Sequence, residues 1–499
     1  MDEGLLEAAP SYGRGGTTCS VCPTRYCERA CNMYQSPAVS TGSPMAARTR
    51  HLIEAPITPT LLRLAMPNII VMMAQAAVST CEVYFVGWLG VEALAGVSLV
   101  FPLIMLMQTM SAGGMGGGVA SAVARALGAG RRSDADALAL HALVIASVMG
   151  ILFTTGALSG GPVLYRAMGG AGGTLAAALA YSNVVFAGAL GFWLFNTLAS
   201  VVRGAGNMLL PAGIVIGGGV VTLVLSPALI MGWGPLPQLG IAGAGIALII
   251  YYSLGSLVLL GYLRSSRSLV RLRLSGIRCQ RAVFWEILRV GVPGSLNTVL
   301  TNLNVVILTS LVGPFGTFAL AGYGMGARLE YLQIPLVFGF GSALVTMVGT
   351  NIGAGHAARA QRVAWVGAAL AAAVTGSIGL FGACFPHLWL GLFSANPEVL
   401  AAGTAYLRIV APTYGCFGLG LALYFASQGA GRLLWPLLAG GARLAVAAGG
   451  GWIASRWLGG GLPTLFTAIA VAFVVYAVMV AAAIRAGAWS KERCHAQNA

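Results

Sequence analysis

The sequence predicts an all-α membrane protein, with twelve transmembrane helices in two pseudo-symmetric six-helix lobes around a central cleft. Of its 499 residues, 58% are hydrophobic and 8% are charged, whereas a soluble protein carries about 25% charged residues. An apolar stretch of about 20 residues crosses a bilayer as one helix, and open strands cannot satisfy their backbone there. Twelve such stretches follow one another, near residues 67–87, 94–124, 137–158, 176–202, 209–231, 240–263, 287–312, 318–349, 363–388, 399–427, 433–456 and 462–485.

An internal repeat predicts the two lobes. Four segments of the first half return in the same order 225 or 226 residues later: LLRLAMP (61–67) as ILRVGVP (287–293), LGVEALAG (89–96) as FGTFALAG (315–322), LGAGRR (127–132) as IGAGHA (352–357), and RGAGNMLLP (203–211) as QGAGRLLWP (428–436). Each unit holds six spans, an even number, so both units enter the membrane from the same side as parallel repeats. We expect an N-lobe at 58–263, a basic cytoplasmic linker at 264–286 and a C-lobe at 287–485.

The net charge of +15 has two readings, a nucleic-acid partner or the positive-inside rule of membrane proteins, and we favour the second. Seven arginines lie between Arg264 and Arg289, against one acid, Glu286. This segment is therefore expected in the cytoplasm, together with the loops that face the same side: 125–136, 203–208, 350–362 and 428–432. The prediction is a multi-pass protein of the cell (inner) membrane, in contact with lipid and not with nucleic acid, with both termini cytoplasmic.

The two ends of the chain, 1–57 and 486–499, are expected to be polar tails, the first of them disordered. Near the start, four cysteines lie close enough together to hold a zinc ion or an iron–sulfur cluster: Cys19, Cys22, Cys27 and Cys31. A competing interpretation is that this segment is a disordered tail, or that translation begins at Met45, and we favour it.

The spans carry no enzyme signature. The sequence has no HExxH, no Gly-x-Ser-x-Gly elbow and no P-loop that would bind ATP. Two duplicated lobes around a cleft are typical of a transporter that rocks between two states. We therefore expect a transporter rather than an enzyme, driven by an ion gradient and without a cofactor other than the coupling ion.

One acid stands out within the apolar spans. From Pro67 to Ala124 the only ionisable residues are Glu82 and Glu92, and Glu92 follows the Gly90 break, where a loop would fall. A carboxylate inside a membrane is costly when it is charged and unpaired, so it can take up a proton on one side and release it on the other. Alternatively, Glu82 is a hydrogen-bonded structural residue, or its span ends early and it faces water.

The repeated segments resemble a known transporter family. RLAMP…CEVYFVGWLGVEALAG…ARALGAGRRSDA is similar to the first two spans of the multidrug and toxic compound extrusion (MATE) family, and RVGVP…FALAGYGMGARLE…GTNIGAG is similar to the start of its second half. The resemblance covers about residues 58–485. It implies a monomeric antiporter that exports amphipathic, often cationic, drugs or toxins in exchange for H⁺ or Na⁺. A lipid-linked precursor flippase of a related fold is the alternative.

The resemblance also implies a cation-coupling site in the N-lobe. Glu82 matches the aspartate of the family's first helix, and Asn196 matches an asparagine of its fourth. In the fifth helix the family usually reads Asn-x-x-x-Asp-Pro, and here Thr222 and Ser226 replace the amide and the second acid. A single acid favours H⁺ over Na⁺. Pro67, about 15 residues before Glu82, is expected at the start of its helix.

A substrate cavity is expected around polar and aromatic residues. Asn297, Thr301 and Asn304 are spaced to form a polar stripe on one helical face. The alternative is that they hydrogen-bond to neighbouring helices. Glu330 is expected in the same cavity, or paired with Arg328 at the start of helix eight. Tyr84 could offer an aromatic face to a cationic substrate.

Overall fold

The computed structural model describes residues 44–272, 280–456 and 461–489, and within these ranges every regular element is helical. The first half of the chain forms α2 (Pro44–Glu54), α3 (Ile57–Gly87), α4 (Val91–Gln108), the π-helix η1 (Thr109–Met115), α5 (Gly116–Gly128), α6 (Arg132–Ala167), α7 (Gly172–Ala187), α8 (Ala189–Gly204), α9 (Leu209–Met231) and α10 (Ile241–Arg264). The second half forms α11 (Arg281–Val312), η2 (Gly313–Phe315), α12 (Thr317–Gly353), α13 (Ala357–Cys384), α14 (Pro386–Leu390), α15 (Pro397–Val410), η3 (Ala411–Thr413), α16 (Tyr414–Ala430), α17 (Leu434–Arg456) and α18 (Leu462–Arg485).

Each of the twelve apolar stretches becomes a helical segment. Within the described ranges, ten helical segments are long and apolar enough to cross a bilayer, and α7 with α8, bent by 49°, would make an eleventh. The remaining stretch is the 23-residue helix α17. Three spans are interrupted: the second by η1, the fourth by the bend at Gly188 and the tenth by η3.

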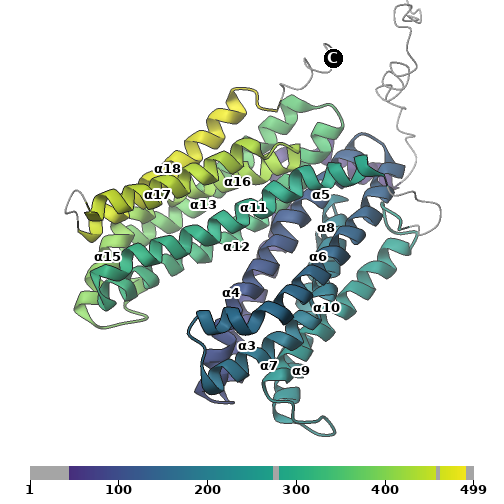
Figure 1. The fold of residues 1–499 in the computed structure, drawn as a ribbon. Coiled ribbons are helices and arrows are strands. Elements are labelled where there is room, and N and C mark those ends of the chain that lie inside the picture. The colour runs from purple at the N-terminus through teal and green to yellow at the C-terminus, as the bar shows by residue number, and fades with distance from the viewer. Residues whose placement is uncertain (1–43, 273–279, 457–460, 490–499) are drawn as a thin grey trace, which may run out of the picture. The chain divides into compact units, whose positions relative to one another are not determined.

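The helices form two bundles, which correspond to the two sequence repeats. Helices α3 to α10 make the N-lobe and α11 to α18 the C-lobe (Figure 1). The N-lobe has its own apolar core, which includes Trp193 and Phe186, and the C-lobe core includes Phe466 and Tyr414. Side chains of α2 and the first part of α3 pack into a cluster made mainly by the C-lobe.

The start of α3 differs from the expectation. The helix begins at Ile57 and runs through Pro67, so Pro67 is inside the helix rather than at its start. The reason is packing: Leu61 and Ala65 are fully buried against the C-lobe cluster, which stabilises the turns before the proline. Part of the segment expected as a disordered tail is also ordered, because residues 44–54 form α2. Asn351 donates a hydrogen bond to the Leu52 carbonyl and holds this helix on α12.

Hydrogen bonds between the lobes recur with the same period as the internal sequence repeat. Ser121 donates a hydrogen bond to the Gln428 carbonyl at 2.5 Å, and the residues 225 positions away, Thr346 and Arg203, form the equivalent bond at 3.0 Å. Equivalent pairs of contacts of this kind are what a two-fold axis between the lobes produces. The parallel-repeat arrangement is thus visible at the level of single hydrogen bonds.

The helices that cross at this axis approach very closely. A methyl group at Gly128 would overlap the Thr350 carbonyl oxygen, and one at Gly353 would overlap the carbonyl oxygen of Arg125. Only residues without a side chain allow backbones this near to each other, as is common between membrane helices. The LGAG and IGAG repeats of the sequence are therefore the points at which α5 and α12 meet.

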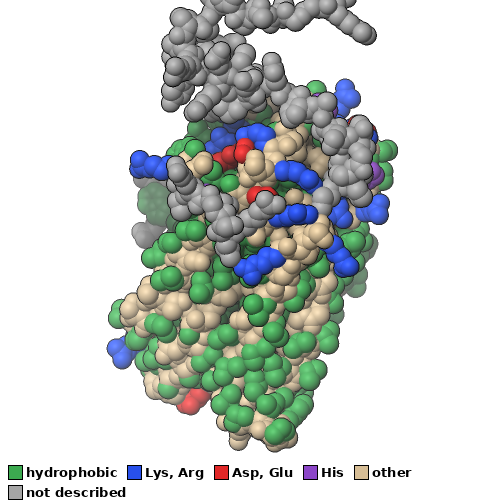
Figure 2. All heavy atoms as spheres, turned by 90° about the vertical axis from the view of Figure 1, so that its right-hand side faces the viewer, with side chains coloured by type: hydrophobic (Ala, Val, Ile, Leu, Met, Phe, Trp, Pro, Cys, Tyr) green, Lys and Arg blue, Asp and Glu red, His purple; other side chains and the backbone are tan. Residues whose placement is uncertain are grey.

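The lobes meet at the end of the bundles where the arginines gather. Helices α5, α8, α10, α12 and α16 all end on this side, and arginines lie in or beside the connections that follow them, among them Arg131, Arg203, Arg267, Arg359 and Arg432. Figure 2 shows Lys and Arg side chains concentrated at one end, while hydrophobic side chains cover much of the face below them. Away from this end, α3 packs on α9 within its own lobe. We call the arginine-rich side the basic end.

Candidate functional site

Glu82 lies on the face of α3 that packs on α9. Val78, one turn before it, is in contact with the site of Gly219 on α9. Residues three or four apart share a helical face. Glu82 therefore lies on the same face as Val78, Thr222 lies on the same face as Gly219, and these two faces are in contact. The Glu82 Oε1 atom is buried and has no hydrogen-bond partner among the described residues. Since unpaired buried oxygens are rare in proteins, this atom marks a candidate site.

Two tyrosines from other helices are near enough to Glu82 to interact with it electrostatically. Tyr181 of α7 and Tyr252 of α10 interact with it electrostatically, and both are buried. Tyr252 packs against Phe192 of α8, with ring centroids 4.3 Å apart. Glu82 itself is buried, and among the described residues no charged side chain forms an ion pair with it. The sequence analysis missed both tyrosines, because aromatic residues in apolar spans give no signal of which face they occupy.

The other residues expected at the coupling site are buried in the same lobe but bond within their own helices. Asn196 donates to the Phe192 carbonyl at 3.2 Å, and Thr222 donates to the Gly218 carbonyl at 2.9 Å. Ser226 Oγ is buried, and none of the described residues forms a hydrogen bond with it. Thr222 lies on the surface of α9 that faces Glu82. The carboxylate has no hydrogen bond to any of the three side chains within the described residues.

The polar stripe of α11 lines a cavity in the C-lobe. Asn297, Thr301 and Asn304 lie along one wall of a space of about 520 Å³, its open mouth included. Other walls come from α12, α16, α17 and α18, through Ile334, Phe417, Leu421, Gly440, Arg443 and Tyr476. Arg443, the only charged residue between Leu434 and Ile453, was not singled out in the sequence analysis, although a lone arginine in an apolar span is itself a signal.

Glu330 and Tyr84 do not line this cavity. Glu330 accepts a hydrogen bond from the Tyr406 hydroxyl at 3.1 Å and interacts electrostatically with Arg443. The expected pairing with Arg328 is wrong, because the Arg328 guanidinium lies over the Phe393 ring instead. Tyr84 is 64% exposed, and its ring packs on Trp88 of the same helix. The structure thus brings three of the five expected cavity residues together.

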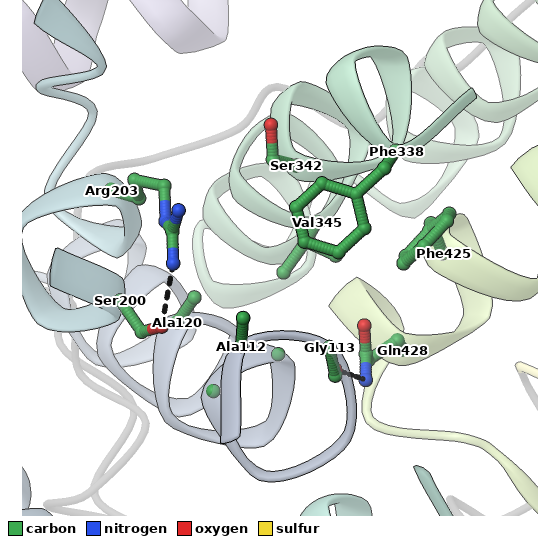
Figure 3. Close-up of a pocket in the computed structure, with 12 residues that line it drawn as sticks. Ala112, Gly113, Ala120, Ser200, Arg203, Phe338, Ser342, Val345, Phe425 and Gln428 are labelled. Atoms are coloured by element: carbon green, nitrogen blue, oxygen red, sulfur yellow. Dashed lines mark hydrogen bonds between the residues drawn. The ribbon is translucent and has the colours of Figure 1, made fainter. Parts of the chain in front are cut away.

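A second, narrower crevice lies between the lobes (Figure 3). Arg203 of α8 donates a hydrogen bond to Ser200 at 3.1 Å, and Gln428 of α16 donates to the Gly113 carbonyl of η1 at 3.0 Å. Phe338 and Phe425 of the C-lobe form an opposite wall, with their ring planes nearly perpendicular. A π-helix leaves carbonyls outside the regular hydrogen-bond pattern, and here the Gln428 amide satisfies one of them across the junction.

The cysteine cluster at 19–31 lies outside the described residues. Within the described ranges, no group of three His, Cys, Asp or Glu side chains could hold a metal ion. The metal prediction for the first residues of the chain therefore stays a prediction.

Solved structures with this fold are transporters. One solved structure is described as the outward-facing conformation of a multidrug resistance MATE family transporter of the MOP superfamily. The chain matches it with a TM-score of 0.79 and 25% identity, over 88% of this chain and 98% of that one. A MOP superfamily transporter from Pyrococcus furiosus, whose binding pocket is described as having reverse polarity, matches with a TM-score of 0.81 and 25% identity over the same shares.

Curated relatives agree with this. A probable multidrug resistance protein NorM of Deinococcus radiodurans is 30% identical over 378 residues, which are 70% of this chain and 78% of the relative. A protein of Shewanella oneidensis named FAD transporter is 29% identical over 390 residues, 76% of this chain and 84% of that one.

The MatE family model matches the chain twice, at residues 67–228 and 293–453, once in each lobe. The two matched segments begin 226 residues apart, which is the period of the repeat. They cover well over half of a chain whose helices, lobes and intramembrane acid were described above. The chain belongs to the MatE family, and it is a multi-pass membrane transporter of the multidrug and toxic compound extrusion type.

Proposed function

We propose that the protein is a secondary antiporter that exports amphipathic, mostly cationic small molecules in exchange for protons, with Glu82 as the coupling acid. The observation that carries the proposal is the buried Glu82 Oε1, which has no hydrogen-bond partner within the described residues. A carboxylate without a fixed cation or donor is free to gain and lose a proton as access to it alternates between the two sides. The acid needs no second ligand to perform this step.

Protons suit this site better than Na⁺. A sodium ion requires several oxygen ligands at once, whereas the Thr222 hydroxyl and the Asn196 amide each donate to a carbonyl of their own helix and form no hydrogen bond with Glu82. In addition, no second charged side chain within the described ranges acts on Glu82. A lone carboxylate can bind one proton, which neutralises its charge, with no rearrangement of the surrounding helices.

We place the basic end in the cytoplasm, following the positive-inside rule. The lobes are joined at that end by the α5–α12 crossing and by the Ser121 and Thr346 hydrogen bonds. This conformation is therefore closed toward the cytoplasm. Export requires a second state in which these contacts break and the crevice beside Arg203 opens.

We assign substrate contacts to the C-lobe cavity lined by Asn297, Thr301 and Asn304. Amide and hydroxyl groups beside aliphatic and aromatic side chains suit amphipathic compounds of varied shape. One relative is named a FAD transporter, so acidic aromatic compounds belong among the substrates to be tested. A flippase for lipid-linked precursors would need several charged groups along the crevice, where Arg203 is the one charged residue among the twelve that line it.

Transport of a fluorescent organic cation in proteoliposomes tests the proposal, with pH and Na⁺ gradients applied separately. We expect movement of the cation when the pH gradient alone is imposed. Transport that needs a Na⁺ gradient, or no transport under either gradient, would contradict the proton antiporter.

A further inference from the structure

Arg443 is a buried cation close to the middle of a transmembrane helix. It lies nine residues after the start of α17 and is 8% exposed. Three aromatic rings surround its guanidinium, those of Phe417, Phe473 and Tyr476, with centroids 5.5, 5.4 and 5.8 Å from Cζ. Aromatic faces stabilise a guanidinium electrostatically, yet they accept none of its hydrogen bonds in the plane of the group.

The guanidinium has no ion pair or hydrogen bond within the described residues. Glu330 is the acid that interacts with it electrostatically, but the two do not approach within the 4.0 Å of a salt bridge. Tyr406 already donates a hydrogen bond to the Glu330 carboxylate. Arg443 therefore retains a full set of planar donors, which is costly at this depth and marks a functional site.

These donors belong to a side chain that lines the C-lobe cavity. Asn304 lines the same cavity, and its buried Oδ1 atom accepts no hydrogen bond from the part of the chain that the structure describes. Gly440, one turn before Arg443, has no side chain, and a methyl group there would come within 2.7 Å of Asn297 Oδ1. The missing side chain lets the Asn297 amide lie directly against α17, one turn from the guanidinium.

We propose that this cavity is an anion subsite, in which Arg443 binds the carboxylate or phosphate of an acidic aromatic substrate. The inference rests on the proposed export function and names a class of substrate for it. A planar guanidinium matches the two oxygens of such a group and binds them bidentately. The three rings fix its orientation, and Asn304 lines the same cavity. Glu330 offsets part of the positive charge while the subsite is empty.

Riboflavin and riboflavin 5′-phosphate provide a matched test, because they share one fluorescent ring and differ by a phosphate. Both are offered to wild-type proteoliposomes under the same pH gradient. Since one charge-assisted hydrogen-bonded contact is worth about tenfold or more in affinity, we expect the phosphate to be exported about tenfold faster. R443Q should abolish this preference, and R443K, which keeps the charge but loses the fork, should fall between the two.

The control is R166Q, which removes an exposed arginine in the last turn of α6 and should retain the preference for the phosphate. An equal rate for the two flavins in the wild type, or an unchanged preference in folded R443Q, would overturn the subsite. If both Arg443 variants fail to fold, a competition experiment with the wild-type protein tests the subsite instead. Riboflavin 5′-phosphate should then inhibit export of the fluorescent cation more strongly than riboflavin does, and equal inhibition would count against the subsite.

Failure of the proposed function gives a different result. If the wild type moves no fluorescent cation under a pH gradient, the antiporter proposal is wrong. Binding of the two flavins to the detergent-solubilised protein still tests the subsite in that case, by equilibrium dialysis. Preferential binding of the phosphate that disappears in R443Q supports it, and equal binding excludes it.

Discussion

Arg125 of α5 faces Glu286 of α11 across the junction of the two lobes, with Nη2 and Oε1 3.7 Å apart. Arg125 is 6% exposed and also donates to Ser121 and to the Gly429 carbonyl of the C-lobe. Its counterpart in the second repeat is Thr350, so the pair has no symmetric equivalent. The contact therefore joins the lobes at the basic end through one buried cation and one partly exposed acid.

We predict that E286Q favours separation of the lobes at the basic end. The substitution leaves a buried guanidinium without its carboxylate, a loss of roughly 1–3 kcal/mol that affects only the closed state. The measurement is the rate at which a cysteine placed at Ala112, on the crevice wall, reacts with a thiol reagent in a cysteine-free background. The rate should increase in E286Q. D134N, which breaks the exposed pair of Arg131 and Asp134 within the N-lobe, is the control, and an equal increase there would contradict the prediction.

The close crossing of α5 and α12 gives a second prediction. G128A and G353A each place a methyl group against a carbonyl oxygen of the other lobe, and overpacking of this kind costs about 1–3 kcal/mol. Because the two contacts are related by the repeat, we expect both variants to favour the open state to a similar extent in the cysteine assay at Ala112. G156A, where a methyl group meets no atom within 4 Å, should behave as the wild type. Unaltered reactivity in both variants would show that the crossing does not limit opening.

Replacement of the acid in α3 tests the coupling step. E82Q keeps the size of the side chain and removes its ability to bind and release a proton. We expect a protein that inserts and folds normally but whose efflux under an imposed pH gradient falls to the level of empty liposomes. The matched control is E92Q, which removes the exposed acid of the same lobe at the start of α4. Normal drug resistance in cells that express E82Q would refute the role of this acid.

The helices could be predicted from the sequence because lipid demands a minimum length of apolar chain. The span expected at 209–231 coincides with α9, and the repeat correctly predicted two lobes. The interruptions could not be predicted in the same way. The bend at Gly188 places this residue where a side chain would collide with Ile249 of α10, and such a contact between distant segments leaves no local pattern.

The candidate site was predictable only in part for the same reason. Glu82 stood out because an acid in an apolar span is rare, and the stripe of α11 because its spacing matches a helical turn. Tyr181 and Tyr252 reach Glu82 from two other helices, and Arg443 reaches the α11 stripe from α17. These neighbours depend on how the helices rotate and pack, which the sequence of each span does not specify.

Replacement of Na⁺ by K⁺ at fixed pH provides a last prediction, on the identity of the coupling ion. Among the described residues no second acid acts on Glu82, and the side chains of Asn196, Thr222 and Ser226 are neutral, so none of them would offset the charge of a Na⁺ ion. We therefore expect the rate of efflux driven by a pH gradient to be the same in the two salts. The measurement uses proteoliposomes with equal concentrations of one cation on both sides, so that no Na⁺ gradient contributes. A rate that rises with Na⁺ and saturates would mean that the carboxylate binds Na⁺ together with Thr222 or Ser226, and T222A and S226A should then weaken that dependence.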